Sequence, residues 1–198
     1  MNAELLEAFS GKRVLLLQGP MGPFFARLAS QLGTVAEQVF KVNFNGGDWL
    51  FYPRRSIQYR GTLADWPGEL ERLLRDLRID AVILFGDCRP IHVPVHGIAE
   101  KLGTEVWAFE EGYVRPNFVT FEAHGVNNRS RLPRDAAFYR QAVQPALPPE
   151  REVGKAFRYA VAWSTQYYAA ALICGFSFRS YKHHRRLSIL EVIPWLIS

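Results

Sequence analysis

The sequence AVILF at positions 81–85, followed by GDCRP at 86–90, decides the fold of this chain. Five consecutive apolar residues that end at a glycine are typical of a strand buried on both faces, as in a parallel sheet. Similar runs occur at 13–17 (RVLLL) and 106–109 (VWAF), and residues 35–42 predict one more strand. The chain therefore contains four predicted strands at wide, regular spacing.

Helical patterns fill the intervals between these strands. Pro23 predicts the start of a first helix, which Gly33 ends. Leucines over residues 70–77 repeat with helical spacing after a predicted N-cap at Asp65, and residues 91–102 predict a third helix. The order β-α-β-α-β-α-β predicts an α/β fold, with a Rossmann-like parallel sheet and flanking helices joined by right-handed crossovers. Residues 43–53, which contain two adjacent glycines, are expected to form a loop.

Composition agrees with a globular protein. The 198 residues are 48% hydrophobic and 22% charged, which excludes disordered, collagen-like and coiled-coil classes. The two cysteines, Cys88 and Cys174, are far apart, which argues against a disulfide scaffold and favours a reducing compartment. Residues 1–13 contain no apolar segment of the secretory type, so a cytoplasmic location is expected.

Charge and proline content suggest three parts. We predict a Rossmann-like N-terminal domain over residues 1–143, a proline-rich linker over 144–152, and a helical, basic extension over 153–198. The net charge of +5 falls entirely in residues 151–198, because basic and acidic residues balance over 1–150. A neutral domain with a basic tail and no nucleic-acid motif makes nucleic-acid binding the least favoured function, and no nucleic-acid partner is expected.

The extension begins with an uncharged, aromatic stretch at residues 159–178, directly before a basic run at 179–186. Its length would suffice to span a bilayer, but Ser164, Thr165 and Gln166 lie in the middle. An aromatic helix beside basic residues suits an anionic membrane surface or a lipid-linked substrate. A helix buried between domains, with a solvated basic flank, is the competing interpretation.

The candidate binding residues follow the predicted strands, at the carboxyl edge where open α/β sheets bind ligands. The turn at 19–23 (GPMGP) precedes a helix whose N-terminus could bind an anion, although a tight turn alone would also explain it. Arg89 or Arg115 could hold an anionic sugar or a phosphate, or could simply pair with the carboxylates of this edge. The residues predicted to bind substrate are Gln18, Gly19, Gly22, Asn45, Gly46, Asp48, Arg89, His92, Gly112 and Arg115.

Carboxylates at the same edge are the candidate catalytic residues, namely Asp87, Glu110 and Glu111. Neighbours in a strand point to opposite faces, so at most one of the two glutamates should enter a cleft and act as a general base. A solvated turn is the alternative. His92 and His96 are four residues apart, but Pro94 intervenes and no further ligand motif accompanies them, so no metal site is predicted.

Several of these segments together resemble one family, the capsular polysaccharide export proteins of Gram-negative bacteria, which are also described as β-Kdo glycosyltransferases. Each motif is weak alone, but their order along nearly the whole chain is specific. The matching segments are QGPMGPFF (18–25), KVNFNGGD (41–48), FGDCRPIH (85–92), FEEGYVRP (109–116) and GVN (125–127).

The resemblance implies one half of a GT-B transferase and transfer of Kdo, an eight-carbon acidic sugar, from CMP-Kdo to a lysophospholipid-linked acceptor. It implies a peripheral position at the inner face of the inner membrane, with an anionic lipid surface, a lipid-linked or polysaccharide acceptor and other capsule assembly and export proteins as partners. No cofactor is expected, since CMP-Kdo is the donor substrate. Glu110-Glu111-Gly112 resembles the acidic-acidic-glycine motif of related transferases.

The sequence departs from the family in one respect. Relatives carry a His-Pro motif that binds the CMP phosphate in their second half, and this chain has no His-Pro pair. The resemblance therefore predicts that the chain is the acceptor-side, N-terminal half, so it is expected to bind CMP weakly if at all. A non-catalytic binding or scaffold module at the capsule assembly site is the alternative function.

Overall fold

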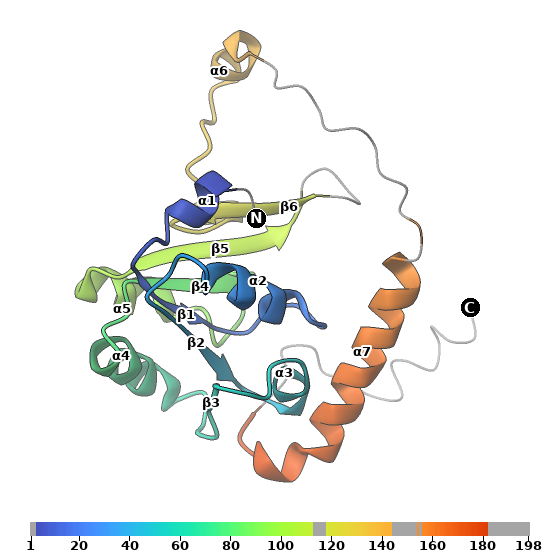
Figure 1. The fold of residues 1–198 in the computed structure, drawn as a ribbon. Coiled ribbons are helices and arrows are strands. Elements are labelled where there is room, and N and C mark those ends of the chain that lie inside the picture. The colour runs from blue at the N-terminus through green and yellow to red at the C-terminus, as the bar shows by residue number, and fades with distance from the viewer. Residues whose placement is uncertain (1–2, 113–117, 144–153, 155, 182–198) are drawn as a thin grey trace.

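A six-stranded sheet organises the chain, in the order β3-β2-β1-β4-β5-β6 (Figure 1). The structure is a computed structural model that describes residues 3–112, 118–143, 154 and 156–181. All pairings are parallel except that between β5 and β6. The predicted α/β fold with a Rossmann-like sheet is confirmed. The strands are β1 (Arg13–Leu16), β2 (Gln38–Asn43), β3 (Ile57–Gln58), β4 (Ala81–Phe85), β5 (Glu105–Glu111) and β6 (Val119–Ala123).

Helices cover both faces of this sheet. On one face α4 (Trp66–Asp76) and α5 (Val95–Leu102) pack in a core that includes Leu15, Val82 and Leu84. On the other face α2 (Phe24–Leu32) packs in a core that includes Leu16 and Ile83, and α1 (Ala3–Glu7) lies on the same side. Successive strand residues thus enter opposite cores, which explains why β1 and β4 are continuously apolar rather than alternating.

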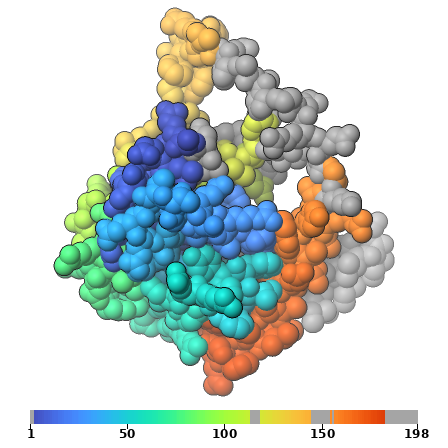
Figure 2. Space-filling model, viewed as in Figure 1, coloured from blue at the N-terminus to red at the C-terminus, as the bar shows by residue number. Residues whose placement is uncertain are grey.

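The C-terminal helix α7 (Ala156–Ile173) lies along one side of the sheet and contacts the short helix α3 (Gly46–Phe51) (Figures 1 and 2). A 3₁₀ turn, η2 (Gly175–Ser177), follows it. Helix α6 (Ala136–Gln141) stands apart from the sheet and buries none of its residues (Figure 2). Another 3₁₀ turn, η1 (Asn127–Arg129), follows β6. The predicted linker, 144–152, lies outside the described residues.

Several predicted boundaries were wrong. Residues 43–53 are not a loop throughout, since Asn45 caps α3 by accepting a hydrogen bond from the Asp48 backbone N–H. β2 begins at Gln38 rather than residue 35, and α5 begins at Val95 rather than residue 91. The two glutamates do end a strand, as predicted, since they are the last residues of β5, and the alternative of a solvated turn is not what forms. The short β3 and the antiparallel β6 carry no signal that the sequence interpretation used.

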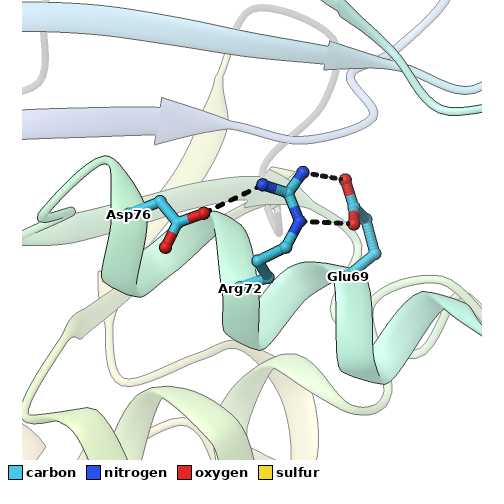
Figure 3. Close-up of polar contacts among 3 residues, drawn as sticks. All are labelled: Glu69, Arg72 and Asp76. Carbon is cyan, nitrogen blue, oxygen red and sulfur yellow. Dashed lines mark hydrogen bonds and ion pairs between the residues drawn. The ribbon is translucent and has the colours of Figure 1, made fainter.

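The exposed side of α4 carries a network of ion pairs (Figure 3). Arg72 donates two hydrogen bonds to Glu69, at 2.7 and 2.9 Å, and one to Asp76 at 2.9 Å. These partners raise the pKa of Arg72. Such exposed pairs contribute little to stability, so the network shapes the solvated surface of α4 rather than the candidate site.

Candidate functional site

Three segments meet at the carboxyl edge of the sheet, as the sequence predicts. Residues 18–22 follow β1, residues 44–48 follow β2, and residues 86–92 follow β4. A hydrogen-bond network joins them, and α7 contributes to it from a distant part of the chain.

Asp48 is at the centre of this network. The residue is buried and its carboxylate accepts hydrogen bonds from the Phe44 backbone N–H at 3.0 Å, from Gln18 Nε2 at 3.1 Å and from Tyr167 Oη at 3.0 Å. Burial and the neighbouring carboxylate raise the pKa of Tyr167 well above its usual value, so the hydroxyl stays a donor. Asp48 is thus occupied by contacts within the chain rather than open to a ligand.

The amide side chains around Asp48 are similarly engaged. Gln18 Nε2 lies 3.2 Å from Tyr167 Oη and 3.0 Å from Tyr181 Oη, while Asn45 Nδ2 donates to Tyr167 Oη at 2.7 Å. Gln18 and Asn45 are each only 2% exposed. Gln18 and Asn45 therefore hold α7 and Tyr181 against the edge of the sheet.

The glycines of this edge have the same role. A Cβ on Gly22 would lie 2.8 Å from the ring of Trp163, and one on Gly47 would lie 2.5 Å from the ring of Tyr167. A Cβ on Gly46 would overlap the Ala170 carbonyl oxygen and lie 2.6 Å from the Cys174 Cβ. The glycines lack side chains where α7 approaches the backbone closely. The space beside them is filled by α7 and is not a cradle for a phosphate.

Arg89 is the predicted site residue that best keeps access to a ligand. Its Nη1 donates to Gln18 Oε1 at 3.2 Å and to the Gly19 carbonyl at 3.0 Å. Burial lowers the pKa of Arg89 from its usual value, partly offset by Tyr167 and Asp48, although an arginine remains protonated under ordinary conditions. The guanidinium lines a pocket of about 150 Å³ whose walls include Tyr59, Ile91 and Tyr181. Aromatic and apolar walls with one oriented cation suit a ligand that carries an anionic group.

The two glutamates that end β5 differ in their surroundings. Glu110 is half-buried, and its Oε2 accepts a hydrogen bond from Asn127 Nδ2 at 3.3 Å. A Cβ on Gly86 would lie 3.6 Å from Arg89 Nε and 3.7 Å from Glu110 Oε2, so the cation and this carboxylate flank the same backbone position. Glu111 is exposed and pairs with Val119, and strand alternation places it on the opposite face of the sheet. Glu110 rather than Glu111 therefore accompanies Arg89.

Asp87 and His92 lie beneath this surface. Asp87 is 4% exposed, and its Oδ2 accepts a hydrogen bond from the Val126 backbone N–H at 3.2 Å. His92 is fully buried, with Nδ1 2.6 Å from the Gly86 carbonyl oxygen. His96 Nε2 lies 3.9 Å from Asp87 Oδ2, and burial lowers the pKa of His96. These side chains hold the 86–92 loop and the 125–127 segment in place, so they position the edge rather than face a ligand.

The structure thus brings Gln18, Gly19, Arg89 and Glu110 together, and leaves Glu111 on the other face. Gly112 is buried, and its N–H donates to the Phe118 carbonyl at 3.2 Å, so it pairs with the residue before β6. Arg115 lies outside the described residues.

Sequence reasoning missed Tyr167, Tyr181 and Lys41. Lys41 is 3% exposed and donates to the Val42 carbonyl, and burial lowers its pKa to about 8 against the opposing attraction of Asp48. The two tyrosines lie more than a hundred residues from their partners, so no local pattern links them. The spacing of Trp163 and Tyr167 does place them on one helix face, which was the available signal.

Two general features of the described part of the chain bear on function. It contains no group of three His, Cys, Asp or Glu side chains arranged to hold a metal ion. None of its helices, α7 included, has the length and hydropathy needed to cross a membrane.

Comparison with known proteins identifies the family. A family model described as capsule polysaccharide biosynthesis protein matches residues 80–197. The chain is 38% identical to the capsule polysaccharide export protein KpsS of Escherichia coli over 187 residues, which cover 94% of this chain and 47% of that protein. It is 36% identical to the capsule polysaccharide modification protein LipB of Neisseria meningitidis serogroup B over 197 residues, 96% of this chain and 47% of that protein.

The chain therefore spans about half the length of the curated relatives that it matches. The alignments with KpsS and LipB cover 94% and 96% of the chain, whereas the family model matches only from residue 80 onward. On this basis the chain belongs to the capsule polysaccharide biosynthesis protein family.

Proposed function

We propose that this chain forms the acceptor-binding part of a glycosyltransferase that moves Kdo from CMP-Kdo to a lysophospholipid-linked acceptor at the cytoplasmic face of the inner membrane. The supporting observation is the oriented guanidinium of Arg89 in a pocket with apolar and aromatic walls. A phosphate on the acceptor is the anion that this arginine would bind, in charge-assisted hydrogen bonds. The matched relatives are named as capsule polysaccharide export and modification proteins, and a lipid-linked acceptor fits those roles.

Glu110 is our candidate for the general base. The acceptor hydroxyl oxygen would form a bond to the anomeric carbon of Kdo while the bond from that carbon to CMP breaks, and the hydroxyl proton would pass to the Glu110 carboxylate. The hydrogen bond from Asn127 fixes one carboxylate oxygen, and the backbone N–H of Glu111 donates to the other at 3.0 Å. A carboxylate held in this way beside a bound acceptor is suited to remove a proton.

A non-catalytic binding module is the second candidate. The observation that favours it is the engagement of Asp48, Asn45 and Gln18 by α7 and Tyr181, which leaves these polar side chains little capacity for a substrate. Such a module would hold a lipid-linked saccharide without transferring a sugar to it.

A transfer assay distinguishes the two functions. The assay uses a full-length relative with substitutions at the positions that align with this chain, and mass spectrometry measures Kdo attached to lysophosphatidylglycerol. We expect Glu110→Gln to lower the rate about 10²–10⁴-fold, the usual contribution of a general base, with the melting temperature unchanged. Glu111→Gln is the matched control and should retain the wild-type rate. Equal rates for both variants and the wild type would rule out Glu110 as the base.

A further inference from the structure

A second hollow at this edge has a different character from the Arg89 pocket. It lies between the turn after β1, the ends of β4 and β6, and the first half of α7, and has a volume of about 530 Å³. We call it the α7 groove. Its lining residues are Pro20, Met21, Phe24, Phe85, Val119, Ala160, Val161, Trp163 and Ser164.

The walls of the α7 groove are apolar almost throughout. Among the described residues that line it, Ser164 is the only one with a polar side chain other than the Trp163 indole. Its hydroxyl donates to the Val161 carbonyl at 3.0 Å within the helix. The groove therefore offers a ligand little hydrogen bonding from these side chains. Val119 and Val161 are 54% and 47% exposed, so the groove leaves apolar surface in water. A groove of this volume with mainly apolar walls has the dimensions of a site for an apolar ligand.

The groove lies beside the pocket that Arg89 lines, although the two share no lining residue among those that the structure describes. Phe85 lines the groove, and the guanidinium carbon of Arg89 lies 5.9 Å from the centre of its ring. Arg89 also donates to the Gly19 carbonyl, and the next residue, Pro20, lines the groove. The turn at Gly19 and Pro20 and the ring of Phe85 thus separate Arg89 from the α7 groove.

A second cation lies at the α7 side of the groove. The guanidinium carbon of Arg27 is 5.9 Å from the ring of Trp163, which lines the groove. At the sheet side, the backbone of Glu111 pairs with that of the groove residue Val119. Two cations beside apolar walls complement a molecule with an anionic head and one apolar tail better than a neutral apolar molecule.

We propose that the α7 groove binds one hydrocarbon chain of the acceptor lipid while Arg89 binds its anionic headgroup, an inference that rests on the function proposed above. The groove would then hold the tail and bring the headgroup to the edge where Glu110 lies. Remote apolar contacts of this type place the reacting hydroxyl and restrict its motion, which is how binding energy aids a transfer reaction.

The test measures binding of lysophosphatidylglycerol to this chain by calorimetry, below the concentration at which the lipid forms micelles. Ala160→Phe places a ring in the groove, and Ala169→Phe puts the same ring on an exposed position of α7 outside it. We expect Ala160→Phe to weaken binding at least tenfold and Ala169→Phe to leave it unchanged. In the wild type, each methylene removed from the lipid chain should weaken binding by up to about fourfold, the value for a fully buried methylene. Val161→Asp, on the wall of the groove, should weaken binding as Ala160→Phe does.

The possible outcomes separate this inference from the proposed function. If Arg89→Gln weakens binding but Ala160→Phe and Val161→Asp do not, the groove does not hold the tail, and the headgroup pocket remains. If affinity does not depend on chain length, or no lysophosphatidylglycerol binds, the inference is overturned. If the groove variants weaken binding but the Glu110 transfer assay fails, the groove inference stands and the proposed catalysis falls.

Discussion

Replacing Tyr167 by phenylalanine tests whether the buried polar network fastens α7 to the sheet. The substitution keeps the ring against Gly47 and removes one hydroxyl. That hydroxyl donates to Asp48 at 3.0 Å and accepts from Asn45 at 2.7 Å and from Gln18 at 3.2 Å. Tyr167→Phe therefore changes hydrogen bonding while leaving the apolar packing in place.

The magnitude follows from what remains. Asp48 keeps its hydrogen bonds from the Phe44 N–H and from Gln18, so its charge is not left without donors. It loses one bond of the charged type, worth about 1.5–3 kcal/mol, and the buried Asn45 amide loses an acceptor, which costs about 1–3 kcal/mol. Because the two costs overlap and neighbours relax, we expect the free energy of unfolding to fall by about 3 kcal/mol. For a chain of this size that corresponds to a drop of roughly 6–12 °C in melting temperature.

Chemical denaturation followed by circular dichroism, together with a thermal scan, measures the change. Tyr159→Phe is the control, because Tyr159 is 53% exposed and stacks on Trp163 through its ring rather than its hydroxyl. The control should change stability by no more than about 0.5 kcal/mol. A double-mutant cycle with Asp48→Asn should give a coupling energy of about 1–3 kcal/mol. A Tyr167→Phe protein as stable as the control, with no coupling to Asp48, would refute the role of the network.

Three further outcomes are expected. Gly46→Ala should destabilise the chain by about 1–3 kcal/mol in denaturant, because its Cβ would overlap the Ala170 carbonyl; Gly97→Ala, in α5 with open space around it, should be neutral or stabilising. Lys41 has a folded pKa of about 8, below its usual 10.5, so between these pH values the unfolded state binds more protons than the folded state. The free energy of unfolding of the wild type should therefore rise from pH 8 to 10 relative to that of Lys41→Met, and parallel pH curves for the two proteins would contradict this. The chain should bind anionic liposomes, weakening with salt as charges are screened over about 10 Å near 0.1 M, and Leu172→Glu, at a position 84% exposed, should weaken binding further; equal binding to neutral vesicles would count against it.

Much of the sheet could be predicted because the core strands are covered by helices on both faces. Burial on both faces requires continuous apolar residues, which occur at 81–85 and at 13–17, and both segments form the predicted strands. The leucine spacing of α4 likewise reflects its burial on one face. Local pattern and tertiary burial agree in these elements, so a sequence suffices to find them.

The misses have a common physical cause, since they depend on contacts with distant segments. Helix α3 contains two adjacent glycines, which ordinarily predict a turn, but here they allow α7 to pack on the backbone. The strand β6 depends on antiparallel pairing with β5. The alternation of strands and helices that predicted the parallel sheet does not predict an antiparallel strand. In the candidate site, the carboxyl-edge rule predicted that Gln18 and Arg89 lie at one edge, where they are hydrogen-bonded to each other. It could not distinguish Glu110 from Asp87, because burial separates them.

The hydrogen bonds of Tyr167 and Tyr181 also have a consequence for the order of folding. The hydrogen bonds from Tyr167 to Asp48 and from Gln18 to Tyr181 close chain segments of 119 and 163 residues. Loop closure on this scale is entropically costly, so we expect β1, β2 and β4 to pair first and α7 to dock last. During synthesis, the edge that carries Arg89 would then be completed only after Tyr181 has left the ribosome. Native-state hydrogen exchange can test this order: the amides of α7 should open at a lower free energy than those of β4, and equal protection would show that sheet and helix fold as one unit.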